Sequence, residues 1–154
     1  MTFQASIRKY KDTDCDAVSK LFYETVHYIN ARDYTDAQLY AWAKDERRLL
    51  SCRSNLARQY TLVAESGGEI VGFGSIDGAD CLDLLFVHRD FQRRGIATAL
   101  CDELERGRTK IKTYASITAK PFFESRGYAV VKEQEVERSG VKLKNYEMLK
   151  IADK

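Results

Sequence analysis

The stretch from residue 82 to residue 104 most constrains how this chain can fold. It begins with an apolar run, Leu82 to Val87, which predicts a buried strand. A polar loop with the pattern Gln92-x-x-Gly95-x-Ala97 follows, and it leads into apolar residues at the spacing of one helix face. The stretch therefore predicts a strand, a tight loop and the start of a helix. The apolar face of that helix consists of Ile96, Ala97, Leu100 and Leu104.

A loop that opens directly onto a helix favours anions. The N–H groups of the first helical turn lack intrahelical partners, and the aligned peptide dipoles make this end partly positive. Gly95 and Ala97 add little bulk, so a diphosphate can approach the main chain closely. We therefore expect a pyrophosphate-containing cofactor to bind the amides of this bend. These amides belong to Arg93, Arg94, Gly95, Ile96, Ala97 and Thr98.

A second motif follows the helix and reads Ala119-Lys120-Pro121-Phe122-Phe123-Glu124-Ser125-Arg126-Gly127-Tyr128. Together with the Gln92 loop, it resembles the GNAT superfamily of N-acetyltransferases, most specifically from Leu82 to Tyr128. The run from Ser116 to Glu124 is similar to the small bacterial YafP-like branch of that superfamily. The resemblance implies acetyl-CoA as cosubstrate. It also implies direct acetyl transfer to a primary amine of a small molecule or peptide, within a ternary complex.

Local patterns predict one α+β domain over residues 1–154. The order of elements agrees with a GNAT-like mixed, mostly antiparallel sheet, with helices on both faces and a splayed parallel strand pair. Expected strands are Ser6 to Tyr10, Tyr60 to Glu65, Ile70 to Ile76, Cys81 to Val87, Ile111 to Ser116, Tyr128 to Arg138 and Val141 to Ile151. Expected helices are Thr13 to Ile29, Tyr34 to Ala43 with Thr35 as cap, Gly95 to Gly107 and Ala119 to Arg126, besides a helical or irregular stretch from Asp45 to Ala57.

In the resembled family, the two parallel strands diverge and the pantetheine arm pairs with their exposed main chain as a substitute strand. The resemblance assigns this pairing to Leu85, Phe86 and Val87, with Ser116 at the end of the partner strand. It implies that a main-chain N–H near Leu85 stabilises the oxyanion that forms when an amine attacks the thioester. Ser116 stands where the family frequently has asparagine.

Asp83 is the candidate general base, because an amine nucleophile must be neutral and Asp83 lies on the strand that carries the thioester site. Strand alternation places Asp83 on the same face as Cys81 and Leu85. Asp83 can equally be an exposed residue or the partner of a nearby arginine. Glu65 and Asp77 are weaker candidates for the base.

Phe123 belongs to the expected cofactor-binding residues but departs from the family pattern, which has a tyrosine at this position to protonate the leaving thiolate. Since thiolates are weak bases, water or the substrate's own proton can replace that tyrosine. The missing tyrosine also motivates an alternative, a non-catalytic acyl-CoA-binding sensor or interaction module. Lys120, Arg93 and Arg94 could contact the nucleotide phosphates or be plain surface charge.

The composition excludes several classes of protein. Apolar residues make up 44% and aromatic residues 11% of the chain, which excludes a disordered protein. The net charge of +2 is too small to indicate a polyanionic partner. Acidic residues also lie among the basic ones, so the charge pattern does not favour nucleic-acid binding. No apolar run approaches the roughly 20 residues of a membrane span, and the N-terminus lacks a signal-peptide pattern. We expect a cytoplasmic protein.

The scattered cysteines are expected to be buried free thiols, and neither His27 nor His88 has a metal-like partner, so no metal site is expected. Tyr34, Tyr40 and Trp42 either pack their helix on the sheet or form a wall of the acceptor pocket. The sequence does not fix the oligomeric state, and a homodimer is one option. The cysteines are Cys15, Cys52, Cys81 and Cys101.

Overall fold

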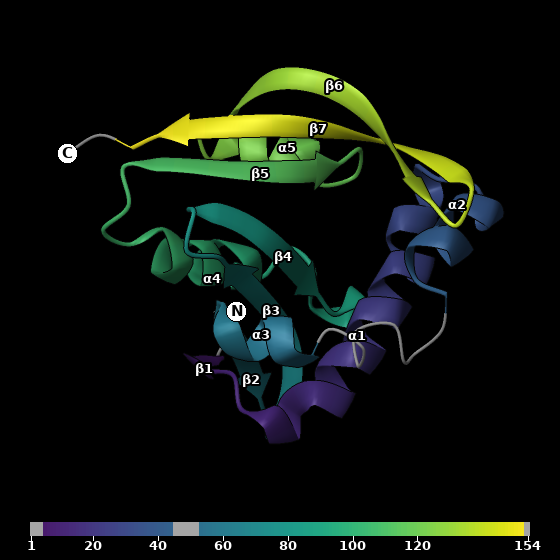
Figure 1. Cartoon of the computed structure of the whole chain (residues 1–154). Coiled ribbons are helices and arrows are strands. Elements are labelled where there is room, and N and C mark those ends of the chain that lie inside the picture. The colour runs from purple at the N-terminus through teal and green to yellow at the C-terminus, as the bar shows by residue number, and fades with distance from the viewer. Residues whose placement is uncertain (1–4, 45–52, 153–154) are drawn as a thin grey trace.

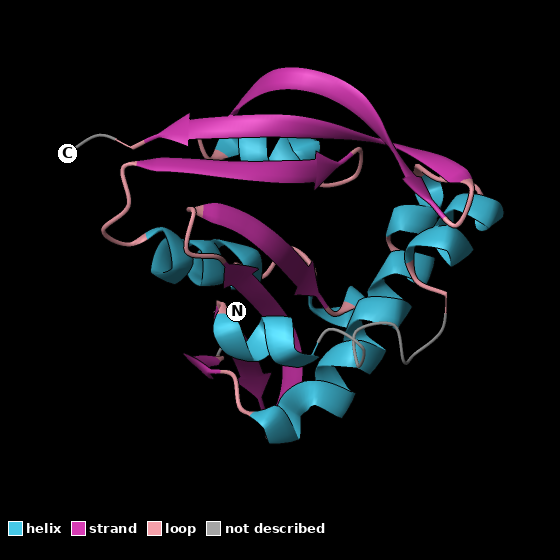
Figure 2. Ribbon diagram, in the orientation of Figure 1, coloured by secondary structure: helices cyan, strands magenta, loops and turns pink. Residues whose placement is uncertain are grey.

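The computed structural model describes residues 5–44 and 53–152, which form a seven-stranded mixed sheet with helices on both faces (Figures 1 and 2). The spatial order of the strands is β1-β2-β3-β4-β5-β7-β6. This arrangement confirms the α+β, GNAT-like fold expected from the sequence. The strands are β1 (Ser6–Lys9), β2 (Tyr60–Ser66), β3 (Glu69–Ile76), β4 (Cys81–Val87), β5 (Lys110–Ser116), β6 (Ala129–Arg138) and β7 (Val141–Ile151).

The strand pair β4 and β5 is parallel, whereas the other neighbouring pairs are antiparallel. Their ladder consists of two residue pairs within the described chain, Cys81 with Lys112 and Leu82 with Thr113. The Thr113 hydroxyl donates to the carbonyl of Leu82 at 2.9 Å. Beyond this point the strands diverge toward the C-terminal end of α1 (Figure 1). The splayed pair is therefore present, and it forms a fork in the middle of the sheet.

The helices divide between the two faces of the sheet. Residues of α1, α2 and α3 share one hydrophobic cluster with Val63 and Phe73, and residues of α4 and α5 share the other with Leu62 and Leu82. The apolar sides of the helices predicted from the sequence thus cover both faces of the sheet. The helices are α1 (Cys15–Tyr28), α2 (Asp36–Trp42), α3 (Arg53–Arg58), α4 (Ile96–Glu105) and α5 (Lys120–Ser125), with short 3-10 turns η1 (Asp12–Asp14), η2 (Asn30–Arg32) and η4 (Arg89–Phe91).

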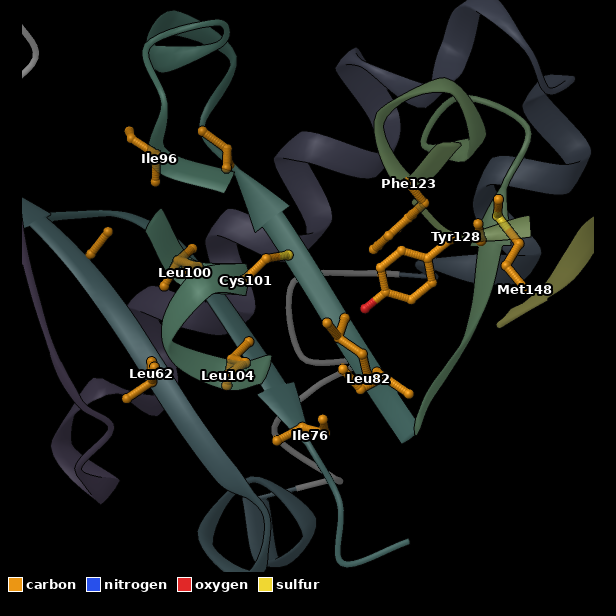
Figure 3. Close-up of a cluster of buried hydrophobic side chains, with 14 of the residues drawn as sticks. Leu62, Ile76, Leu82, Ile96, Leu100, Cys101, Leu104, Phe123, Tyr128 and Met148 are labelled. Atoms are coloured by element: carbon orange, nitrogen blue, oxygen red, sulfur yellow. The ribbon is translucent and has the colours of Figure 1, made fainter. Parts of the chain in front are cut away.

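Helix α4 lies directly on β3 because the residues of β3 beneath the helix are glycines. A Cβ at Gly72 would lie 2.9 Å from Cγ2 of Ile96, and a Cβ at Gly74 would lie 2.9 Å from Cδ1 of Leu104. The close neighbour of these glycines is therefore a helix of the same chain. Figure 3 shows the buried side chains of this cluster, with α4 contributing Ile96, Leu100, Cys101 and Leu104.

The expected elements are present with shifts of one or two residues at their ends. Thr35 is confirmed as the N-cap of α2, since its hydroxyl accepts from the Gln38 N–H in a capping box. The expected helix from Thr13 to Ile29 begins instead with η1 and continues as α1. The hairpin turn at Gly67 and Gly68 has φ of 59° and 83°, as a tight turn between twisted strands requires. Most of the stretch expected from Asp45 to Ala57 lies outside the described residues.

A register shift in β4 corrects one expectation from simple alternation. Ser75 pairs with Leu84 but Ile76 pairs with Leu82, so Asp83 is an extra residue in the strand. Leu82 and Leu85 consequently pack into the α4 cluster, while Leu84 packs into the α1 cluster. Asp83 bonds the side chain of Gln59, which follows α3. Simple alternation, which would put Leu82 and Leu85 on opposite faces of the sheet, therefore fails in this strand because of the bulge.

Candidate functional site

A cleft of about 1040 Å³ occupies the fork between β4 and β5. Its walls come from both strands, the loop that precedes α4, the start of α5, the end of α1 and the β6–β7 hairpin. The expected site residues that line it are Asp83, Leu85, Phe86, Val87, Gln92, Arg93, Gly95, Ile96, Ala97, Thr98, Ser116 and Phe123. Two expected residues, Arg94 and Lys120, lie outside this lining.

The polar main chain of β4 faces the cleft at Leu85 and Val87. The His88 N–H donates to the Val71 carbonyl at 2.8 Å, and Val87 is opposite Gly72. Because hydrogen-bonded and non-hydrogen-bonded pairs alternate in an antiparallel ladder, Phe86 bonds β3, and the N–H of Leu85 and Val87 turns toward β5. Phe86 was expected to offer its main chain, but this alternation leaves only its ring to line the cleft.

The same alternation shows which main-chain groups of β5 point toward β4. The Thr109 carbonyl accepts from the Ala152 N–H at 2.8 Å, which directs alternate residues from Thr109 onward toward β7. The Lys112 N–H donates instead to Asp80 on the β4 side, at 3.0 Å. Tyr114 and Ser116 therefore present their N–H and C=O groups to the fork. The two sides of the fork offer main-chain groups that an extended ligand can pair with as a strand does.

The loop before α4 presents main-chain amides to the same cleft. Arg93 and Gly95 both have left-handed backbone, with φ of 61° and 83°. The first intrahelical bond runs from the Ala99 N–H to the Gly95 carbonyl, so the amides of Ile96, Ala97 and Thr98 have no intrahelical acceptor. A Cβ added at Gly95 would meet no atom within 4 Å, which leaves this turn open to an anion.

Gln92 fixes the start of this loop. Its side-chain amide donates to the carbonyl of Val87 at 2.5 Å and approaches the carbonyl of His88 at 3.4 Å. The His88 ring accepts from the Asp90 N–H at 3.0 Å, which forms the short turn η4. Gln92 therefore ties the end of β4 to the loop and leaves the loop amides free, a structural role that the sequence motif did not distinguish from ligand binding.

Ser116 and Tyr34 hold the end of β5. The Ser116 hydroxyl accepts from the Ala119 N–H at 3.0 Å and from the Asn30 side-chain amide at 3.4 Å. The buried Tyr34 hydroxyl donates to the Lys144 carbonyl at 2.6 Å and accepts from the Ile117 N–H. Burial raises the pKa of Tyr34. Both hydroxyls thus shape the turn between β5 and α5, and Tyr34 and Trp42 belong to the cleft wall while Tyr40 is exposed.

Asp83 is the one carboxylate among the described residues that line the cleft. It is exposed, and one of its oxygens accepts from the Gln59 side chain at 3.1 Å. The weaker candidates are engaged elsewhere, since Glu65 pairs with Arg8 and Asp77 accepts from the Ala79 and Cys81 N–H groups. Of the three expected carboxylates, Asp83 is thus the one that lines the cleft.

Phe123 is buried in the α4 cluster, with its ring 5.1 Å from that of Tyr128 (Figure 3). Tyr128 cannot replace the missing acid, because its hydroxyl donates to Glu105 at 2.8 Å and burial together with that bond raises its pKa. Tyr114 lines the cleft from β5 and is about half exposed. Strand alternation could have suggested the cleft-facing direction of Tyr114, but the sequence did not single it out.

The remaining basic candidates lie on the surface. The Arg94 guanidinium lies 5.2 Å from the centre of the Phe91 ring, and Lys120 pairs with Glu124 at 3.5 Å and lies over Tyr146. Asn30, Gln134 and Asn145 line the cleft, and sequence reasoning missed them because they come from distant elements. These amides lie near Ser116, which pairs with Asn145 in the sheet.

Cys15 and Cys101 are buried free thiols, Cys81 is partly buried, and Cys52 lies outside the described residues. Burial raises the pKa of Cys81 to about 11 and that of Cys101 to about 12. Across the described ranges, no group of three or more His, Cys, Asp or Glu side chains could hold a metal ion. Nor does any helix in those ranges have the length and apolar character to cross a membrane.

Comparison with known proteins identifies relatives over most of the chain. The model of the acetyltransferase (GNAT) domain family matches residues 30–150. YafP of Escherichia coli strain K12, described as an uncharacterised N-acetyltransferase, is 37% identical over 120 residues, which cover 77% of each chain. A GCN5-related N-acetyltransferase from Rhodopseudomonas palustris superposes with a TM-score of 0.89 at 32% identity, covering 99% of this chain and 98% of that one.

The PaiA N-acetyltransferase of Thermoplasma acidophilum, solved in complex with coenzyme A, has the same fold. Its TM-score is 0.77 at 17% identity, with 97% of this chain and 100% of that chain covered.

Proposed function

The chain belongs to the GNAT family of acetyltransferases, and from this we propose that it transfers an acetyl group from acetyl-CoA directly to a primary amine in a ternary complex. The observation that carries the proposal is the fork between β4 and β5, whose main-chain groups and the open α4 amides line one cleft. A cosubstrate with a diphosphate and an extended amide-bearing arm fits this combination. Coenzyme A in the PaiA complex supports the same assignment.

The loop and α4 would bind the diphosphate through the amides of Ile96, Ala97 and Thr98, since the left-handed Arg93 and Gly95 expose them. The main chain of Leu85, Val87, Tyr114 and Ser116 would pair with the pantetheine arm. Acetyl-CoA supplies an activated acetyl group as a thioester. The protein's contribution is then positioning, which makes the attack effectively unimolecular.

The Leu85 N–H is the donor that we assign to the oxyanion, because it points into the fork rather than into the β3 ladder. The amine nitrogen forms a bond to the acetyl carbon as the carbon–sulfur bond breaks. Asp83 would accept the proton that the ammonium must lose before attack. The departing thiolate takes a proton from water or from the amine, since Phe123 has none to give.

Thiol release distinguishes this proposal from an acyl-CoA-binding module. We expect sustained release of free coenzyme A that requires a primary amine and yields one acetylated amine per thiol. Tight acetyl-CoA binding without turnover on any amine of a broad panel would instead support the module. Mass spectrometry of the acetylated product, together with a thiol assay, makes the measurement.

A further inference from the structure

The β6–β7 hairpin forms one wall of the cleft, and its side chains change along the strand from amide to apolar to positively charged. Gln134, Val136 and Arg138 line the cleft from β6, as strand alternation places every second residue on one face. Gln134 pairs with Asn145 and Val136 pairs with Leu143 across the hairpin. Amides therefore lie beside the fork, an apolar pair follows, and a guanidinium lies at the outer end. Arg138 follows Gln134 by four residue steps of extended strand, a distance of about 13 Å.

The charge at the outer end is uncompensated within the described chain. Arg138 is exposed, and no hydrogen bond or ion pair of its side chain exists among the described residues. Arg32 also lines the cleft, but its guanidinium pairs with Asp33 at 3.6 Å. Lys144 lines the cleft as well, and its ammonium pairs with Glu133 at 3.6 Å. Arg138 therefore supplies a positive charge, unpaired within the described ranges, at the outer end of the hairpin wall.

The middle of the cleft is apolar. Trp42 and Phe86 line it with their ring centres 6.4 Å apart, and Leu84, Val136 and Leu143 complete this part of the lining. The acidic residue of the described lining, Asp83, comes from β4 at the fork. A ligand that extends from the fork to the hairpin end therefore meets a carboxylate, an apolar passage and then arginine.

We propose that the acceptor is an elongated amine with an apolar middle and a carboxylate at its far end. This inference rests on the proposed function and adds the substrate class. The amine lies at the fork beside Asp83, the apolar part packs on Phe86 and Val136, and the carboxylate pairs with Arg138. A second ammonium at the far end would meet like charge, so the same geometry disfavours diamines and polyamines.

Three amines with the same eight-carbon chain test the effect of the group at the far end of the acceptor alone. 8-Aminooctanoate, octylamine and 1,8-diaminooctane share the same primary amine and differ in a distal carboxylate, methyl group or ammonium. We expect kcat/KM for the carboxylate to exceed that for octylamine about tenfold, the scale of a charge-assisted hydrogen bond, and the diamine to be the poorest. Equal kcat/KM for the three amines would overturn the substrate class while leaving the transferase intact.

Arg138→Ala should reduce the preference for the carboxylate over octylamine about tenfold, because it removes the cation that pairs with the far end. Lys142→Ala is the matched control, since Lys142 lies on the same hairpin and is exposed but does not line the cleft. The same loss of preference in Lys142→Ala would mean that net charge is responsible and would contradict the assignment to Arg138.

A binding measurement separates this inference from the proposed function. Isothermal titration of the coenzyme A complex with N-acetyl-8-aminooctanoate and N-octylacetamide needs no turnover. Tighter binding of the carboxylate, lost in Arg138→Ala, would support the substrate class even if no amine reacted and direct transfer had failed. Equal affinity for the two amides would refute it.

Discussion

Gly95 combines two properties that a side chain would disturb in different ways. Its φ of 83° disfavours any residue with a Cβ, and its position at the start of α4 leaves the helix amides exposed to an anion. A side chain at this position would meet no other part of the described protein within 4 Å of its Cβ. A substitution here should therefore act on backbone strain and on ligand binding, and not on core packing.

Gly95→Glu should lower acetyl-CoA affinity at least about 100-fold, because the carboxylate repels the diphosphate and fills its approach. Titration calorimetry with acetyl-CoA measures the loss. Gly107→Glu is the control, since Gly107 follows the same helix with φ of 77° and equally open surroundings. It should show a similar loss of stability, on the order of 1–2 kcal/mol, with nearly unchanged affinity. Unaltered acetyl-CoA binding by Gly95→Glu would remove the loop from the site.

Asp83→Asn should lower kcat at acidic to neutral pH by about 100-fold, the typical contribution of a general base, with little change in acetyl-CoA affinity. The effect should shrink at high pH, where the amine is neutral without assistance. Steady-state rates between about pH 6 and 10 provide the test. Asp90→Asn removes an equivalent exposed charge outside the cleft lining and should leave the profile unchanged. A pH–rate profile shared by Asp83→Asn and the native protein would exclude Asp83.

At the scale of elements, the bulge at Asp83 and the fork are parts of one arrangement. The extra residue inverts the alternation of β4, so that Leu85 packs beneath α4 while Phe86 faces α1. The short ladder between β4 and β5 ends at Thr113, whose hydroxyl bonds Leu82. Beyond this bond, main-chain groups that a sheet would normally pair are left for a ligand.

The packing of α4 on β3 keeps the amide turn in place above the fork. Gly74→Ala should destabilise the protein by about 1–3 kcal/mol, because the new methyl would lie 2.9 Å from Leu104 and 3.1 Å from the Leu84 carbonyl. Gly78→Ala is the control, as its added methyl meets nothing within 4 Å, and its effect should be within about 0.5 kcal/mol. Denaturant unfolding of both variants measures these changes in stability. If Gly74→Ala is as stable as Gly78→Ala, α4 can move away from β3 without cost, which would contradict the prediction.

For the whole molecule, a partly buried network of charged side chains joins the two halves of the sheet. Glu105 at the end of α4 pairs with Arg126 at 2.7 Å and with Lys150 of β7 at 2.9 Å, and accepts from Tyr128. Burial alone would raise the pKa of Glu105, but the hydrogen bonds from Arg126, Lys150 and Tyr128 hold it below its ordinary value. The ionised form therefore stabilises the fold.

The pH dependence follows from the sign of that shift. Because the folded pKa is lowered, the stabilisation is fully present above the unfolded value of about 4.3 and is lost as the pH falls through the folded pKa. Glu105→Gln should cost about 3 kcal/mol at pH 7, and its difference from the native protein should narrow below about pH 4. Denaturant unfolding across this pH range measures the difference.

Glu103→Gln is the control for Glu105→Gln. Glu103 lies on the same helix, is more accessible to solvent and pairs only with Arg106 among the described residues, so its substitution should cost less than about 0.5 kcal/mol. A pH-independent difference between Glu105→Gln and the native protein would contradict the ionic role of Glu105.

The sequence by itself determined the local features of this protein. Apolar periodicity located the strands and helices, glycines located the turns, and the Gln92 to Ala97 pattern located the amide loop before α4. These features depend on residues close in the chain, whose spacing alone fixes which side chains share a face. The resemblance carried by the two motifs then gave the family, which the comparisons confirm.

Only the tertiary structure decided how distant residues meet. The bulge at Asp83 depends on pairing with β3, whereas alternation alone would put Leu82 and Leu85 on opposite faces. The wall formed by Asn30, Gln134 and Arg138 joins the end of α1 to a hairpin about 100 residues later. Register and long-range packing, which no local spacing encodes, brought these side chains to one cleft and left Arg138 without a partner in the described chain.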